Sequence, residues 1–171
     1  VALEGVVKHD PDPGVRAAAV TALARQGAES APAIEREADD EAQGVRTAAL
    51  SALAAVLVDC SAEPEAAERM CDRDRIVTRL GRVLGSPPTP ESLSAASAML
   101  RIPNPSEPER ARDVFTRALE AGDARLRGLA AVLCRALPAP GCSAAALRDR
   151  LRVESAPEVK LLVALAIGPR D

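Results

Sequence analysis

Residues 15–23 read VRAAAVTAL, and residues 45–53 repeat almost the same letters as VRTAALSAL. Both copies place apolar side chains at positions 0, 3, 4, 7 and 8 counted from the first valine, which is the spacing of one face of an α-helix. Similar copies begin at Leu126 and Val159, and a weaker copy begins at Ser92. Self-similarity at intervals of roughly 30 to 50 residues is typical of repeat proteins. The sequence therefore predicts a helix that recurs along most of the chain.

Each copy is preceded by a second segment of helical composition. Turn residues separate the two segments, for example Asp10-Pro11-Asp12-Pro13-Gly14 in the first repeat, where aspartate favours the cap and proline the first turn of a helix. The preceding segments cover roughly residues 2–9, 29–38, 73–85, 108–121 and 143–153. A helical hairpin cannot bury its apolar face alone, so we expect the hairpins to stack into a solenoid.

The composition agrees with a chain made only of helices. Hydrophobic residues make up 47% of the chain, yet Phe115 is the one aromatic residue and Trp and Tyr are absent, whereas strands favour aromatic and β-branched residues. We predict an all-α fold, an α-solenoid (superhelix) of about five stacked two-helix repeats, forming a single domain over residues 1–171. The predicted repeats are roughly 1–27, 28–59, 73–103 after an insertion at 60–72, 105–138 and 142–168.

The turn and second helix of the first repeat resemble a known family. The run 10–19, which reads DPDPGVRAAA, resembles bacterial HEAT repeats, including the short type found in phycobilin lyase-like proteins. The resemblance is strong over 1–59, weaker over 105–168 and weakest between them. It implies a HEAT-like solenoid, in which the second helices line an inner surface where partner proteins often dock. The insertion at 60–72 departs from the pattern.

A basic residue recurs at position 1 of four copies, and acidic residues precede it in the turns. One interpretation is a row of cations that binds an acidic partner. The other, which we favour, is a ladder of charge pairs between a cation and a carboxylate of its own or the adjacent turn, each contributing about 0 to 1 kcal/mol and fixing the register of the repeats. The candidate ladder consists of Arg16, Arg46, Arg127, Lys160, Asp10, Asp12, Asp40 and Asp123.

The four cysteines form two local pairs, Cys60 with Cys71 and Cys134 with Cys142. Each pair joins the apolar face of a second helix to the start of the next helical segment. The even number of cysteines and their local pairing favour two disulfides. Each would stabilise the fold by about 3 kcal/mol. Two disulfides would also indicate an extracytoplasmic location, periplasmic or secreted. The alternatives are free thiols in the cytoplasm or, with less support, a metal site, for which the spacing is wrong.

Charge and chemistry exclude several functions. The net charge is −3, with 22 basic and 25 acidic residues mixed along the chain, so we expect no nucleic-acid partner, which requires a basic face. No run is long and apolar enough for direct membrane insertion. Because the chain has one histidine, His9, the usual base for nucleophilic catalysis is almost missing. We therefore expect no enzyme activity, no cofactor and no metal.

The remaining function is a non-catalytic protein–protein interaction or scaffold module, whose partner is another protein. Arginine is enriched at interface hot spots, and Arg25, Arg101 and Arg135 near the ends of second helices are the candidate partner contacts. Two alternatives remain open: a lyase-like or enzyme-accessory HEAT protein, and a structural spacer within a longer repeat chain, which the apolar ends of the sequence suit.

Overall fold

The computed structural model describes residues 2–62, 72–85, 87–102, 105, 107–138 and 141–168. Within these ranges the chain forms ten α-helices and no strand. This confirms the predicted all-α solenoid. The helices pack in sequence order as five hairpins, so each hairpin contacts mainly its neighbours.

The helices keep one alternating order along the chain. The first helices of the hairpins are α1 (Ala2–His9), α3 (Ala31–Glu37), α6 (Arg73–Val83), α8 (Pro108–Glu120) and α10 (Ala144–Val153). The second helices are α2 (Pro13–Leu23), α4 (Gln43–Ala62), α7 (Pro90–Arg101), α9 (Ala124–Ala136) and α11 (Pro157–Ile167). Two short 3₁₀ helices, η1 (Ala24–Gln26) and η2 (Ala28–Ser30), lie between α2 and α3.

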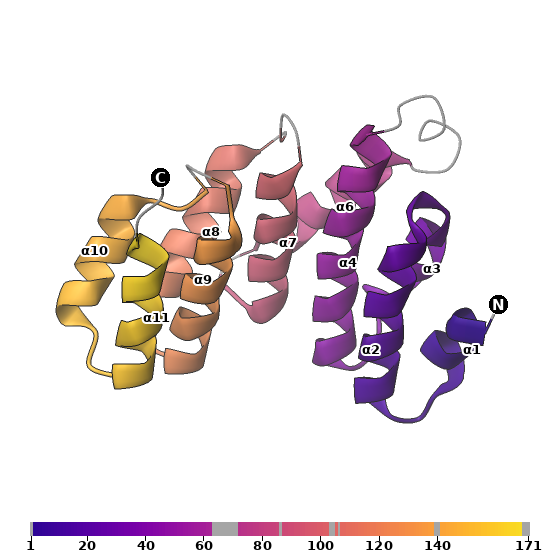
Figure 1. The fold of residues 1–171 in the computed structure, drawn as a ribbon, viewed down its shortest axis with the longest axis horizontal. Helices are drawn as coiled ribbons and strands as arrows, with labels where there is room; N and C mark the ends of the chain where they lie inside the picture. Colours follow the sequence, from indigo (N-terminus) through magenta and orange to yellow (C-terminus); the bar gives the residue numbers. More distant parts are fainter. Residues whose placement is uncertain are drawn as a thin grey trace.

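The second helices stand side by side in one row, with α2 at one end and α11 at the other (Figure 1). Contacts run from α2 to α4, from α4 to α7, from α7 to α9 and from α9 to α11. The helix α4 runs to Ala62, so it extends into the predicted insertion at 60–72, while residues 63–71 of that insertion lie outside the described part.

Side chains in the turns between paired helices cap three of the second helices, α2, α7 and α9. The carboxylate of Asp12 accepts a hydrogen bond from the Gly14 N–H at 2.7 Å, and the carboxylate of Asp123 accepts one from the Arg125 N–H at 2.9 Å. Such caps satisfy backbone donors that a helix leaves free in its first turn. Thr89 and Ser92 cap α7 reciprocally through a capping box. These caps define the first residue of α2, α7 and α9, which sets the register of the side chains that follow in those helices.

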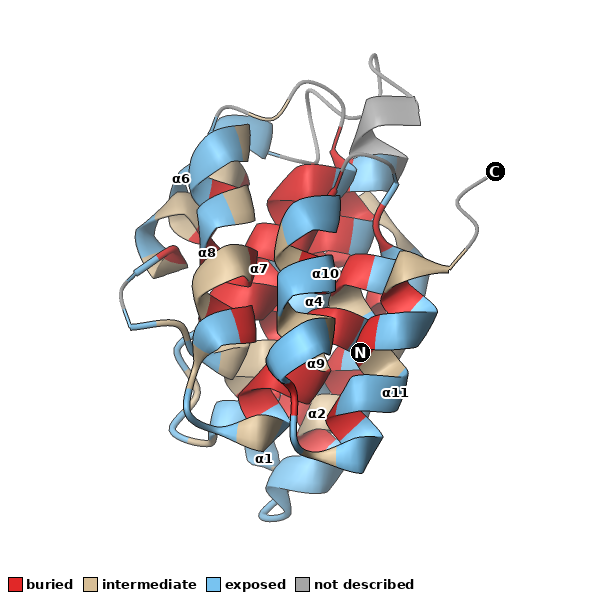
Figure 2. Ribbon diagram, turned by 90° about the vertical axis from the view of Figure 1, so that its left-hand side faces the viewer, coloured by how far each residue is buried: buried red, intermediate tan, exposed pale blue. Residues whose placement is uncertain are grey.

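The core lies between the helices, where buried residues (red) face one another and exposed residues (pale blue) cover the outside (Figure 2). The most enclosed helix is α7, in which every residue from Ser92 to Leu100 is buried. Small side chains such as Ala95 and Ala96 let helices on both sides approach closely. Phe115 is 1% exposed and lies in the same continuous core.

Candidate functional site

Arg16 joins the first hairpin to the second. Its Nε and Nη2 donate to the two carboxylate oxygens of Asp40 at 3.0 and 2.9 Å, and its Nη1 donates to the backbone carbonyl of Asp10 at 3.0 Å. Asp10 follows α1 and Asp40 precedes α4, so one guanidinium holds the turn of its own hairpin and the turn of the next. The side chains of Arg16 and Asp40 are each 10% exposed, which keeps this pair largely out of water.

Arg46 repeats these contacts between the second and third hairpins. Its Nη1 donates to the backbone carbonyls of Asp40 and Glu41 at 2.9 and 2.8 Å. Its Nε and Nη2 donate to Oε1 of Glu91 at 3.3 and 2.8 Å. Glu91 lies in the first turn of α7, so here the acceptor comes from the helix start and not from the turn before it.

Arg127 makes the most buried version, between the fourth and fifth hairpins. Its Nη1 donates to the backbone carbonyls of Ala121 and Gly122 at 2.9 and 2.8 Å, and its Nε and Nη2 donate to the two carboxylate oxygens of Glu154 at 2.7 and 2.8 Å. We call each of these three pairs an inter-repeat connector. They are Arg16–Asp40, Arg46–Glu91 and Arg127–Glu154.

Glu154 is the most perturbed carboxylate of the three connectors. Its side chain is fully buried, Nε of Arg150 lies 3.0 Å from Oε2, and the N–H groups of Ser155 and Ala156 donate to Oε1 at 3.0 and 2.9 Å. The hydrogen bonds from Arg127, supported by the Ala156 N–H and the two arginine charges, outweigh burial and lower the pKa of Glu154 to about 2. The carboxylate is therefore charged at neutral pH although it is enclosed.

The other connector carboxylates shift the same way. Hydrogen bonding from Arg16 lowers the pKa of Asp40 despite the opposing effect of burial. Burial alone would raise the pKa of Glu91, but hydrogen bonds from its own backbone N–H, from Arg46 and from Gln43 together lower it. All three connectors are thus ionised pairs in the folded protein near neutral pH.

The junction between the third and fourth hairpins is built differently. Leu93 occupies the position that Arg16, Arg46 and Arg127 occupy in their hairpins, and it is fully buried. Ala121 lies in the turn before α9 at the position that Asp40 and Glu154 occupy before α4 and α11, where those two residues supply the connector carboxylates. Both halves of a connector are therefore replaced at the same junction, where apolar packing is joined by a hydrogen bond from Nη2 of Arg110 on α8 to the carbonyl of Leu84, directly after α6, at 3.2 Å. A cavity of about 500 Å³, lined in part by Arg82, Glu107 and Arg110, lies beside this junction, between α6 and α8.

The remaining members of the predicted ladder have local roles. Asp12 and Asp123 cap α2 and α9, as described above, and Oδ1 of Asp10 accepts a hydrogen bond from the Asp12 N–H at 2.9 Å. Lys160 is exposed on α11, and no carboxylate of the described residues forms an ion pair with it. Glu91 and Glu154, which the sequence interpretation did not include, supply two of the three acceptors.

Two grooves open on the face formed by the second helices. One, of about 410 Å³, lies between α2 and α4 and is lined by small side chains such as Thr21, Ser51 and Ala55, together with Arg25. The other, of about 440 Å³, lies between α9 and α11; its lining includes Leu129, Val132, Val159 and Leu162, with Arg125 and Glu158 among the charged residues. The second groove is lined by larger apolar side chains than the first, and Val132 is 47% exposed there.

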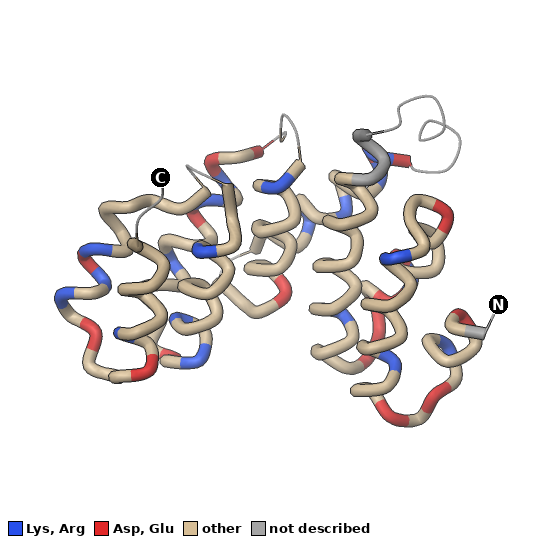
Figure 3. Tube along the Cα trace, in the orientation of Figure 1, with Lys and Arg blue, Asp and Glu red and all other residues tan. Residues whose placement is uncertain are grey.

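The three predicted contact arginines lie at the carboxyl ends of second helices. Arg101 and Arg135 are in the last turns of α7 and α9, Arg25 lies in η1 directly after α2, and all three are exposed. Basic segments (blue) are visible at the upper ends of α2, α7 and α9 in Figure 3. Only Arg25 also lines a groove, so the other two flank the second-helix face without forming part of either groove.

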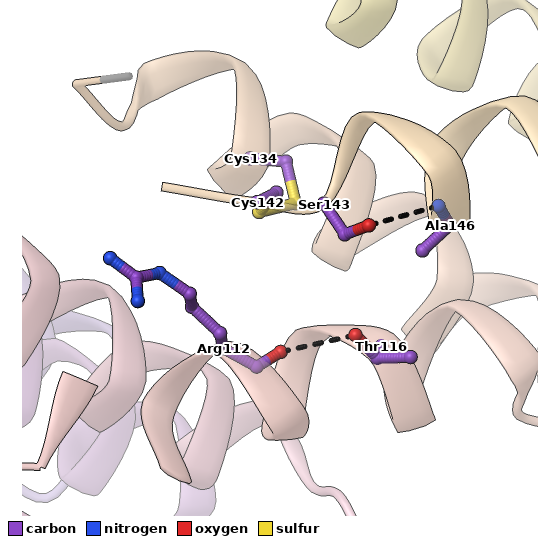
Figure 4. Close-up of a disulfide and its surroundings, with 6 residues drawn as sticks. All are labelled: Arg112, Thr116, Cys134, Cys142, Ser143 and Ala146. Carbon is purple, nitrogen blue, oxygen red and sulfur yellow. Dashed lines mark hydrogen bonds between the residues drawn. A yellow bond between two sulfur atoms is a disulfide. The ribbon is translucent and has the colours of Figure 1, made fainter. Parts of the chain in front are cut away.

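A disulfide links Cys134 to Cys142, with the two Cα atoms 5.6 Å apart. Cys142 directly precedes Ser143, whose hydroxyl caps α10 by accepting a hydrogen bond from the Ala146 N–H (Figure 4). The bridge thus ties the end of α9 to the start of α10, and it confirms the disulfide predicted for this pair. The other predicted pair, Cys60 with Cys71, lies outside the residues whose side chains are described.

Two other kinds of site were considered in the sequence, a metal site and a membrane-spanning segment. Among the described residues, no three His, Cys, Asp or Glu side chains gather closely enough to hold a metal ion. None of the helices described is long and apolar enough to cross a membrane.

Comparison with known proteins agrees with this geometry. A family model described as HEAT repeats matches residues 2–75, which contain the first two hairpins and the start of α6. These residues are therefore similar to HEAT repeats, and the match supports the expected resemblance to HEAT repeats but does not confirm the phycobilin lyase-like type. No curated protein matches the chain.

Proposed function

We propose that this protein is a non-catalytic interaction module that binds another protein on the face of its second helices. The observation that carries the proposal is the groove between α9 and α11, where Leu129, Val132 and Leu162 line an open hydrophobic surface. Partly exposed apolar side chains with charged neighbours, here Arg125 and Glu158, are typical of sites that take an apolar helix or peptide. HEAT repeats commonly mediate such contacts.

The connectors support this role because they keep the binding face in a fixed shape. Each connector couples the turn of one hairpin to the next, so the second helices are held in register before a partner arrives. Preorganisation of this kind reduces the entropy lost on binding. The lyase-like alternative has less support, because the grooves lack aromatic side chains that would stack on a flat ligand.

The proposal is tested by site-specific photo-crosslinking in extracts of the native host. A photoreactive residue at Val132, in the groove, is compared with one at Val153, which is 68% exposed on α10 and outside both grooves. We expect one defined protein to crosslink to position 132 and not to position 153. With that protein purified, Val132→Glu should weaken binding at least about tenfold, because it places a charge in an apolar interface, while Val153→Glu should not. Equal adducts at both positions, or none at 132, would contradict the proposal.

We also propose an extracytoplasmic location, supported by the Cys134–Cys142 disulfide, since such bonds persist in oxidising compartments. Protein isolated from its native host is alkylated while denatured, with and without prior reduction, and its thiols are counted by mass spectrometry. A linked peptide pair containing positions 134 and 142 is expected. Free thiols at both positions would place the protein in a reducing compartment.

A further inference from the structure

The face of the second helices changes character along the solenoid. Positions 3 and 6 of the repeat carry small side chains in the first three hairpins, namely Ala18, Thr21, Ala48, Ser51, Ala95 and Ala98. The same positions carry larger apolar side chains in the fourth and fifth hairpins, namely Leu129, Val132, Leu162 and Leu165. At position 6, Val132 and Leu165 are exposed to a similar extent, 47% and 44%. The strongly apolar part of this face is therefore confined to α9 and α11.

Two opposite charges lie at the amino end of this apolar surface. Arg125 is in the first turn of α9 and Glu158 is in the first turn of α11, so both occupy position −1 of their repeats. Both side chains are exposed and both line the groove. Among the described residues, neither forms an ion pair. Because α9 and α11 run side by side in the same direction (Figure 1), the groove has a cation on one wall and an anion on the other at the same level.

The spacing along the groove suits a helix as the bound segment. Positions −1 to 6 span seven residues, which is about 10 Å or two helical turns. A helix that lies in a groove presents apolar side chains to it every three or four residues, and positions 3 and 6 receive them at that interval. An extended peptide recognised through its backbone needs polar groups along its path. Apart from Arg125 and Glu158, every described residue that lines this groove is apolar or glycine.

We propose that the groove binds an amphipathic helix of the partner, whose apolar stripe is flanked near one end by an acidic side chain on the α9 side and a basic side chain on the α11 side. The acidic side chain then faces Arg125, and the basic side chain faces Glu158. This inference rests on the proposed function and names the chemistry of the partner. Opposite charges on the two walls select partners by their order of charges, because the reverse order brings like charges together.

The probe is a displayed library of amphipathic helices of about 20 residues, long enough to be helical in isolation. Their apolar stripe is fixed, and the flanking positions at both ends are drawn from Glu, Lys and Ala. Selection on the purified chain should yield helices with one acidic and one basic residue on opposite flanks of the same end. A selected helix is then made as a labelled peptide, and its dissociation constant is measured by fluorescence anisotropy.

Reversing the charges of the groove tests the assignment of the two walls. Arg125→Glu combined with Glu158→Arg should weaken binding of the selected peptide about fivefold or more, because two exposed attractive contacts become repulsive. A peptide whose two flanking charges are exchanged should prefer this double variant to the wild type. Arg148→Glu places the same charge change as Arg125→Glu on the exposed side of α10, outside the groove, and should alter the constant less than about twofold.

Three results would overturn this inference. Selected helices without a preference for charged flanks, or a double variant that affects binding no more than Arg148→Glu, would show that the wall charges do not select the partner. If Val132→Glu still abolished binding in those cases, the groove would remain the binding site and the proposed function would stand. A library that yields no binder would show that the bound segment is not a helix, whereas the proposed function fails only if no protein crosslinks at position 132. Circular dichroism of each variant separates a lost contact from a lost fold.

Discussion

Replacing Glu154 with glutamine removes the charge of the most buried connector and leaves the size of the side chain almost unchanged. The carboxylate accepts four hydrogen bonds, two from Arg127 and two from the backbone N–H groups of Ser155 and Ala156, and it balances Arg150 as well. In Glu154→Gln the amide NH₂ faces two guanidinium groups, the buried Arg127 and the partly buried Arg150, which both lose this counter-charge.

Breaking a buried ion pair by removing one partner costs about 3 to 5 kcal/mol. Because glutamine keeps one acceptor oxygen for the backbone N–H groups, we place Glu154→Gln at the lower limit, about 3 kcal/mol. For a chain of this length that loss lowers the melting temperature by about 6 to 12 °C. The matched control is Glu158→Gln, four residues away on the exposed first turn of α11, which should change stability by no more than about 0.5 kcal/mol.

Thermal and urea unfolding followed by circular dichroism at 222 nm measure both variants. Equal and small losses for Glu154→Gln and Glu158→Gln, each below about 1 kcal/mol, would show that the connector adds no more stability than an exposed charge.

Three further predictions concern neighbouring features. Because the folded-state pKa of Glu154 is lowered to about 2, its contribution to the free energy of unfolding is fully present above the unfolded pKa near 4.5 and is lost as the pH falls toward 2. Urea titrations at pH 6 and pH 2.5 should therefore show the wild type losing about 2 kcal/mol more than Glu154→Gln after allowance for screening. Equal losses for the two proteins would contradict this prediction. Cys134→Ser with Cys142→Ser should lower stability by about 3 kcal/mol, as closing this loop predicts, measured by thermal melting against the wild type without reductant; an unchanged melting temperature would show that the bridge adds no stability. Gly81→Ala in α6, where a Cβ meets no atom within 4 Å, should raise the free energy of unfolding by about 0.5 to 1 kcal/mol through helix propensity, and a loss would mean that the site is more crowded than described.

The helices could be predicted from the sequence because each of the two best copies contains a complete helical period. The apolar positions of 15–23 and 45–53 fix one buried face, and Asp12 with Pro13 marks the helix start. Here local preference and tertiary packing agree. The burial of α7 was less visible in the sequence, because its copy contains three serines that are polar by type yet buried in the structure.

The connectors could be predicted only in part. Repetition of a basic residue at position 1 pointed to Arg16, Arg46 and Arg127, and Asp40 was among the expected acceptors. Glu91 and Glu154 were not, because they lie 45 and 27 residues beyond their arginines and their spacing differs between hairpins. Distance along the chain says little about which turn of the next hairpin a guanidinium reaches.

Aspartates near helix starts posed the opposite difficulty. Asp12 and Asp123 were expected as ladder members, yet each accepts from a backbone N–H of its own helix. From the sequence alone, a carboxylate just before a helix fits a helix cap and an inter-repeat ion pair equally well. A comparison of turns across repeats, in which Asp40 and Glu154 fall at equivalent positions, is the signal that would have separated the two roles.

A double-mutant cycle on Arg127 and Glu154 measures whether an arginine–carboxylate connector couples adjacent hairpins. The free energy of unfolding is measured for Arg127→Met, Glu154→Gln, the double variant and the wild type. We predict a coupling energy of about 2 kcal/mol or more, with the double variant no less stable than the worse single variant, because removing both charges leaves neither one buried alone. Losses that add to within about 0.5 kcal/mol would show that the two side chains do not act as a pair and that the connector does not couple the fourth and fifth hairpins.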